Sequence, residues 1–96
     1  MNSRIKYNFP ETRFVRENNI GKQFSHILSE VAEAFDLFQA SDVLTARHFE
    51  ELADLSHSLE TLWRIVERHH GSDLVAQIFA AVQEKNSERG YYEQLN

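Results

Sequence analysis

The chain contains few residues that would interrupt a helix. Its 96 residues include only three glycines and one proline, the residue types that helix interiors tolerate least. Apolar residues recur at three- and four-residue steps over long stretches, which is the spacing of one face of an α-helix. No stretch of useful length alternates between apolar and polar residues as a strand would. The sequence therefore predicts an all-α fold with long helices.

Three long helices are expected in one small domain that covers residues 1–96. Gly71 is a typical stop at a helix C-terminus, and Ser or Asp residues beside it suit the start of the next helix. Gly90 ends the last helix in the same way. The predicted helices run over about 22–40, 44–70 and 73–89.

The boundaries of these helices are expected from local signals. Gly21 interrupts the pattern before the first long helix, and Ser41 and Asp42 offer a stop followed by a new N-cap region. The segment 1–20 is weakly patterned, although Pro10 could open a short helical turn there. The last six residues are expected to form a tail.

Each predicted helix carries one apolar stripe, which we expect to be buried in an antiparallel bundle. At about 100° per residue, the members of each stripe share one side of their helix. They are Phe24, Ile27, Leu28, Val31, Phe35 and Phe38 in the first helix, Leu52, Leu55, Leu59, Leu62, Trp63 and Val66 in the second, and Leu74, Ile78, Phe79 and Val82 in the third.

Composition excludes several classes of function. The hydrophobic fraction of 42% is enough for a core, whereas the net charge of −5 argues against nucleic acid or a membrane surface as the partner. No apolar run approaches the ~18 residues that span a bilayer, and the N-terminus lacks the apolar core of a signal peptide. Cysteine is absent, which excludes disulfides and thiolate chemistry. A cytoplasmic protein is the expectation.

Two pairs of acidic residues stand out on consecutive predicted helices. Glu30 and Glu33 lie in EVAE, and Glu51 and Asp54 lie in ELAD. Residues three apart share one side of a helix, so two helices that fold back on each other could bring all four acids into one cluster. Such crowded carboxylates suit a divalent cation such as Mg²⁺. Each pair alone is equally typical of an ordinary solvated helix face.

A second polar motif lies near the C-terminus, in KNSERGYY. Lys85 and Arg89 continue the apolar stripe of the third predicted helix and are expected to point inward, with Asn86 beside them. Cations at a helix C-terminus also satisfy its dipole and last carbonyl groups. The functional interpretation is that they bind phosphate oxygens, Arg through paired donors and Lys as a point charge.

In this order, EVAE, ELAD and KNSERG resemble the MazG-like all-α nucleoside triphosphate pyrophosphohydrolases over residues 22–92. The resemblance implies a compact bundle that forms a homo-dimer or homo-tetramer. It also implies Mg²⁺-dependent hydrolysis of a (d)NTP to a monophosphate and pyrophosphate for nucleotide pool clean-up, with Mn²⁺ as an alternative ion. The implied residues are Glu30, Glu33, Glu51 and Asp54 as metal ligands, Glu33 also as the catalytic base, and Lys85, Asn86 and Arg89 as substrate contacts.

Other interpretations stay open. A non-catalytic bundle that binds a nucleotide or a protein would show the same stripes. A ferritin-like di-metal protein is a weaker alternative, because it needs Glu-x-x-His on two helices and the first pair here is Glu-x-x-Glu. The five histidines are expected to be structural, with His48 packed or hydrogen-bonded. A homo-oligomer is expected because so small a chain leaves apolar surface over.

Overall fold

The computed structural model describes residues 5–93, so the ends of the predicted N-terminal segment and of the C-terminal tail lie outside the described residues. This part of the chain is all-helical, with no strand, which confirms the all-α part of the predicted fold. The elements are α1 (Phe14–Glu17), α2 (Ile20–Ala40), α3 (Ala46–His70) and α4 (Ser72–Glu88).

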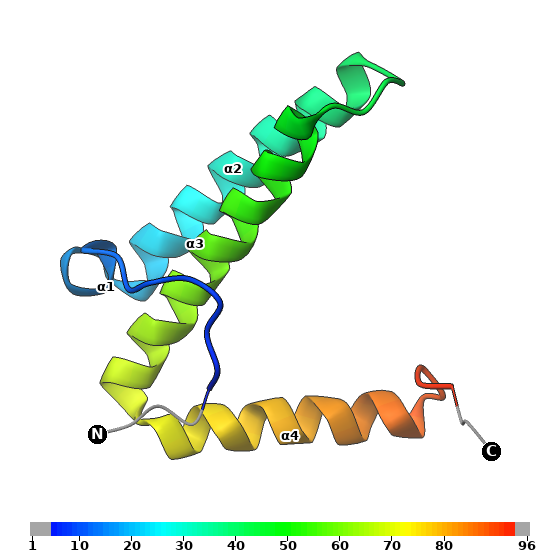
Figure 1. The fold of residues 1–96 in the computed structure, drawn as a ribbon. Coiled ribbons are helices and arrows are strands. Elements are labelled where there is room, and N and C mark those ends of the chain that lie inside the picture. The colour runs from blue at the N-terminus through cyan, green and yellow to red at the C-terminus, as the bar shows by residue number, and fades with distance from the viewer. Residues whose placement is uncertain (1–4, 94–96) are drawn as a thin grey trace.

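The two longest helices form an antiparallel hairpin, and α4 leaves it at an angle (Figure 1). The main tertiary contacts join α2 to α3, while α4 and α1 each pack on α3. The segment before α1 runs back along the lower half of α3 (Figure 1). The predicted compact bundle is therefore only partly present, because α4 diverges from the pair instead of packing along it.

Side-chain caps set the start of both long helices. The Asn19 side chain accepts a hydrogen bond from the backbone N–H of Lys22 at 2.7 Å, so α2 begins at Ile20. The prediction that Gly21 interrupts the helix was wrong, because a capped first turn tolerates glycine. Thr45 is the N-cap of α3, and its backbone N–H donates to Nδ1 of His48 at 3.0 Å.

Further boundaries are partly as predicted. Ser41 ends α2 as expected. The N-cap of α3 is Thr45, four residues further on, so α3 starts at Ala46, two residues later than predicted. Gly71 separates α3 from α4 with φ +91°, and its N–H donates to the carbonyl oxygen of Glu67 at 2.7 Å. Pro10 does not open a helical turn, because the short α1 begins at Phe14.

The core is small and lies mainly where α3 meets α2, α1 and the first turn of α4. Ile65 and Val75 are fully buried. On α2 the buried residues are Gln23, Ile27 and Ala34, which together form the line that faces α3. The other buried residues are Val15, His48, Thr61, Leu62 and Ser72.

Most of the apolar stripes predicted to be buried are exposed. Of the α2 stripe only Ile27 is buried, whereas Leu28 is 58% and Phe35 62% exposed. On α4, Ile78 is 44% and Val82 43% exposed. The physical reason is that α2 meets only one long helix, and its line of contact lies roughly a quarter turn away from the stripe.

Candidate functional site

Cross-helix contacts fix the register of the α2–α3 hairpin. The Gln23 side-chain N–H donates to the carbonyl oxygen of Ser58 at 3.0 Å. Nearer the tip, the Phe38 and His48 rings meet edge-on with centroids 4.9 Å apart. The two acidic motifs lie between these contacts, so the antiparallel pairing brings EVAE and ELAD to the same stretch of the hairpin.

Glu30 is the predicted metal ligand with the most contacts in the described structure. Its carboxylate accepts a hydrogen bond from the Ser58 hydroxyl of α3. Nε2 of His26, one turn earlier on α2, lies 3.2 Å from the same carboxylate oxygen. The Glu30 side chain is only 16% exposed, so its position is set by packing and by two polar neighbours.

Glu30 of α2 and Asp54 of α3 line one pocket of about 190 Å³ at the side of the hairpin. The structure therefore brings together one acid from each motif. The remaining lining comes from both long helices and from the segment that leads into α2, namely Thr12, Phe14, Gln23, His26, His57, Ser58 and Thr61.

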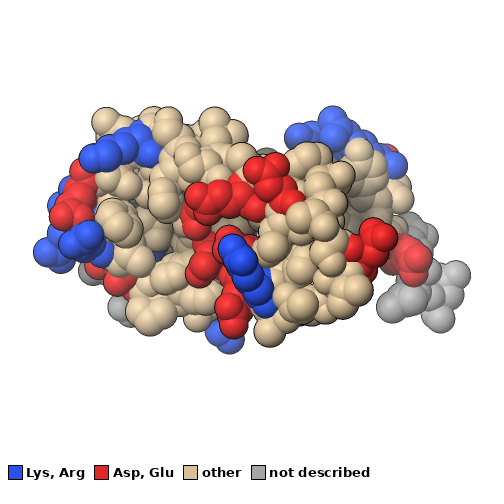
Figure 2. All heavy atoms as spheres, turned by 90° about the horizontal axis from the view of Figure 1, so that it is seen from above, with Lys and Arg blue, Asp and Glu red and all other residues tan. Residues whose placement is uncertain are grey.

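Glu33 and Glu51 lie nearer the tip of the hairpin and do not line this pocket. Glu33 is exposed and Glu51 is half-buried. Figure 2 shows acidic side chains gathered across the middle of the face seen from above. Within residues 5–93, no three His, Asp or Glu side chains are grouped closely enough to hold a metal ion. Carboxylates fit Mg²⁺ chemically, and two of the four predicted ligands share a pocket.

The structure separates the C-terminal motif from this pocket. Lys85, Asn86 and Arg89 lie at the far end of α4 or just past it, and none of them lines the pocket of Glu30. Lys85 and Arg89 are exposed, so the prediction that they point inward was wrong. The reason is the angle at Gly71, which carries the end of α4 away from the hairpin (Figure 1).

The segment before α1 is held by a contact that the sequence did not reveal. The Glu60 carboxylate accepts hydrogen bonds from the backbone N–H groups of Asn8 and Phe9, both at 3.0 Å. The Asn8 side chain donates to it at 3.1 Å. Burial raises the pKa of Glu60, but these hydrogen bonds and the charge of Arg64 outweigh burial and lower its pKa below the usual value.

Aromatic contacts extend this attachment along α3. Phe9 stacks on His57 with ring centroids 4.4 Å apart. The Arg64 guanidinium lies 4.2 Å above the centroid of the Tyr7 ring, and the Tyr7 hydroxyl donates to Glu67 at 3.4 Å. The segment thus lies along α3 from His57 to Glu67. Backbone donors have no residue signature, so no motif could have predicted this attachment.

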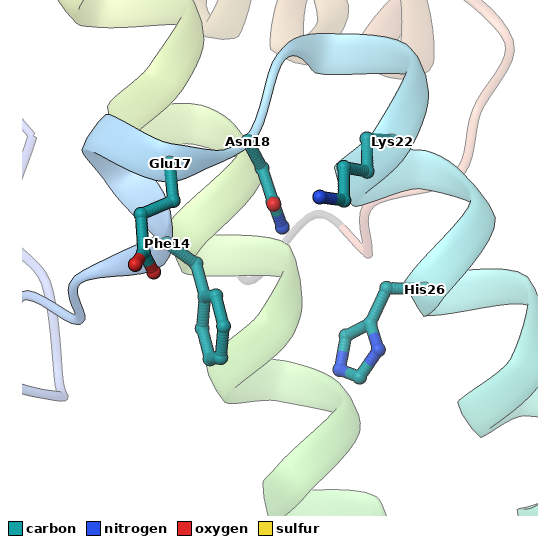
Figure 3. A pocket seen from close by; sticks show the side chains of 5 residues that line it. All are labelled: Phe14, Glu17, Asn18, Lys22 and His26. Carbon is teal, nitrogen blue, oxygen red and sulfur yellow. The ribbon is translucent and has the colours of Figure 1, made fainter.

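A larger cavity of about 410 Å³ lies between α1 and α2 (Figure 3). Phe14 and Glu17 of α1 line it with Asn18, and Lys22 and His26 of α2 complete it. Phe14 and His26 also line the pocket of Glu30, so the two spaces adjoin. Lys22 therefore places a cation beside the acidic pocket, a feature that the sequence motifs did not single out.

No family model, curated protein or solved structure matches this chain. Over the described residues, no helix combines the length and the apolar character needed to cross a membrane. The resemblance to the MazG-like enzymes therefore stays a prediction, carried by EVAE, ELAD and KNSERG.

Proposed function

We propose that this chain is a Mg²⁺-dependent nucleoside triphosphate pyrophosphohydrolase that converts a (d)NTP to a (d)NMP and pyrophosphate. One observation carries the proposal: Glu30 and Asp54, one from each acidic motif, line a single pocket between facing helices. Carboxylate oxygens are the donors that magnesium prefers, and manganese accepts the same donors.

Glu30 and Asp54 would hold the metal at the pocket that they line. Glu33 and Glu51 are further ligands only by the resemblance, since they lie nearer the tip and outside this pocket. The bound ion supplies charge neutralisation for the triphosphate and a polarised water. Glu33 would take the proton of the attacking water as a general base, a role that comes from the resemblance and requires its exposed side chain to reach the pocket of Glu30. Ser58 orients the Glu30 carboxylate by its hydrogen bond.

Cationic side chains would bind the phosphate oxygens. Lys22 lines the cavity that adjoins the acidic pocket, which makes it a candidate contact. Lys85, Asn86 and Arg89 stay proposed contacts through their charge and donor groups, although within one chain they lie on a different arm from the acids.

A second candidate is a non-catalytic bundle that binds a nucleotide or a protein. Two observations favour it. The Glu30 carboxylate already has a hydroxyl donor and a histidine nitrogen as neighbours, which would compete with a metal. The exposed apolar residues of α2, such as Phe35, also offer a surface for a partner.

Incubation of the chain with Mg²⁺ and a panel of (d)NTPs, with pyrophosphate and orthophosphate measured separately, tests the proposal. Pyrophosphate release is expected, and Glu33→Gln or Asp54→Asn should lower it at least about a hundredfold while helicity is unchanged. Glu50→Gln, at an exposed position beside Glu51, is the matched control. Absence of pyrophosphate release by the wild-type chain would refute the hydrolase, and undiminished release by both Glu33→Gln and Asp54→Asn would refute the assigned site. Nucleotide binding without turnover would support the second candidate.

A further inference from the structure

The cavity between α1 and α2 has the size and the walls of a site for a flat ring. Its volume of about 410 Å³ lies within the range of sites for small molecules. The Phe14 and His26 rings lie on opposite sides of it (Figure 3), with centroids 6.3 Å apart and planes tilted by 32°. Aromatic rings stack on the π-face of any nucleobase. Stacking therefore favours a planar ligand, and polar groups must select among such ligands.

A buried hydrogen-bond chain fixes the direction of the Asn18 amide. The Gln23 side chain, which is 1% exposed, donates its N–H to the Ser58 carbonyl oxygen at 3.0 Å. Its own oxygen is therefore left to accept, and it accepts from the Asn18 side-chain N–H at 2.8 Å. Figure 3 shows the Asn18 side chain directed into the cavity that it lines. The Asn18 oxygen is thus an acceptor at this wall, with an orientation set from the core.

Glu17 adds a second acceptor to the lining of the cavity. Nε of Arg13 lies 3.4 Å from one oxygen of its carboxylate, and the Arg13 guanidinium also lies 5.1 Å from the centroid of the Phe14 ring. A carboxylate accepts several hydrogen bonds and donates none when ionised, so this ion pair leaves lone pairs open to a ligand. Two consecutive residues, Glu17 and Asn18, therefore offer acceptor groups to the same cavity.

We infer that this cavity binds guanine, so that the substrate is a guanine nucleotide. Guanine presents two neighbouring donor groups on its Watson–Crick edge, N1–H and the 2-amino group, which match the two acceptors. Adenine and cytosine present one amino group there, and uracil, thymine and hypoxanthine present one ring N–H. Any of these bases leaves one acceptor without a partner, whereas a doubly paired base edge is favoured about fivefold or more.

The position of the cavity agrees with this assignment. Phe14 and His26 line both the cavity and the acidic pocket, so a nucleotide whose phosphates reach Glu30 and Asp54 has its base beside these rings. The inference rests on the proposed function, because it names the base of the same substrate.

Titration of the full chain with guanosine monophosphate (GMP) and inosine monophosphate (IMP) tests the inference without turnover. IMP differs from GMP only in lacking the 2-amino group. Backbone amide chemical shifts around Asn18, followed by NMR, should give a dissociation constant for GMP at least about fivefold below that for IMP. Glu17→Gln should bring this ratio close to one, because an amide NH₂ donor replaces one acceptor oxygen. Glu88→Gln, at an exposed position at the end of α4, is the matched control and should keep the ratio.

Phe14→Leu is an independent variant that removes the stacking ring and leaves both acceptors. It should weaken GMP and IMP alike, at least about fivefold, and keep their ratio. Circular dichroism shows whether each variant keeps its helices. If Glu17→Gln unfolds, a wild-type preference for GMP that folded Phe14→Leu retains at lower affinity still supports the inference.

The outcomes separate this inference from the hydrolase. A wild-type preference for GMP without release of pyrophosphate from GTP would support the guanine site and refute the hydrolase. Equal wild-type binding of GMP and IMP would overturn the guanine site alone, even if GTP is hydrolysed. Absence of GMP binding at millimolar concentration would also overturn it, as would an unchanged ratio in folded Glu17→Gln.

Discussion

The Ser58 hydroxyl of α3 donates a hydrogen bond to the Glu30 carboxylate of α2. This contact joins the two long helices at the wall of the acidic pocket. It also fixes one of the predicted metal ligands, because a carboxylate that is only 16% exposed has little freedom once a hydroxyl holds it. Structural and proposed functional roles therefore meet in one side chain.

Ser58→Ala should lower the free energy of unfolding by about 1.5–3 kcal/mol, the usual range for a hydrogen bond to a charged group. Denaturant unfolding at a fixed protein concentration measures the change. Ser56→Ala is the matched control, because the Ser56 hydroxyl bonds only to the Leu52 carbonyl oxygen on its own helix at an exposed site. Equal effects of the two substitutions would show that the cross-helix bond contributes nothing special.

Gln23 is a further polar link between the hairpin helices. It is 1% exposed, accepts from the Asn18 side chain at 2.8 Å and donates to the Ser58 carbonyl oxygen. Gln23→Met keeps the size but removes both bonds, so unfolding should become easier by about 1–3 kcal/mol. Thermal melting checks this. Gln77→Met, at an exposed position, should leave the melting temperature nearly unchanged, and a similar fall there would contradict the prediction.

Lys22 offers a test that depends on the proposed function. If its ammonium group binds phosphate oxygens, Lys22→Ala should raise KM for the triphosphate about tenfold, the cost of one charged hydrogen bond. A smaller change in kcat is expected, because the contact forms in ground state and transition state alike. Lys6→Ala removes an exposed lysine that does not line the cavity. Steady-state kinetics in which both variants match the wild type would exclude this role.

The apolar spacing correctly predicted the long helices, since α2 and α3 begin within two residues of the expected positions. It did not predict burial. A stripe identifies which residues share one side of a helix, whereas burial depends on whether another element covers that side. Phe35 and Leu28 are therefore exposed although their pattern is that of a core.

The sequence also predicted only part of the candidate site. Three-residue spacing and an antiparallel return were enough to expect Glu30 near Asp54, and they do line one pocket. The direction of α4 after Gly71 has no signature in the sequence, so the separation of Arg89 from the acids was not foreseen. The attachment of the segment before α1 was missed because Glu60 binds backbone N–H groups.

Glu60 should make this attachment sensitive to pH. Its pKa is lowered in the folded chain, chiefly by the hydrogen bonds from Asn8 and Phe9 acting against burial. The resulting stabilisation is complete above the ordinary carboxyl pKa, and it is lost as pH falls through the lowered value.

The backbone amides of Asn8 and Phe9 should therefore be protected from hydrogen exchange at neutral pH and lose protection in acid. Glu60→Gln keeps an acceptor oxygen but not the charge, so protection should be low and independent of pH, whereas Glu11→Gln, at an exposed position in the same segment, should preserve the wild-type profile. Protection factors corrected for intrinsic exchange rates decide the matter, and a Glu60→Gln profile identical to the wild type would show that other contacts hold the segment.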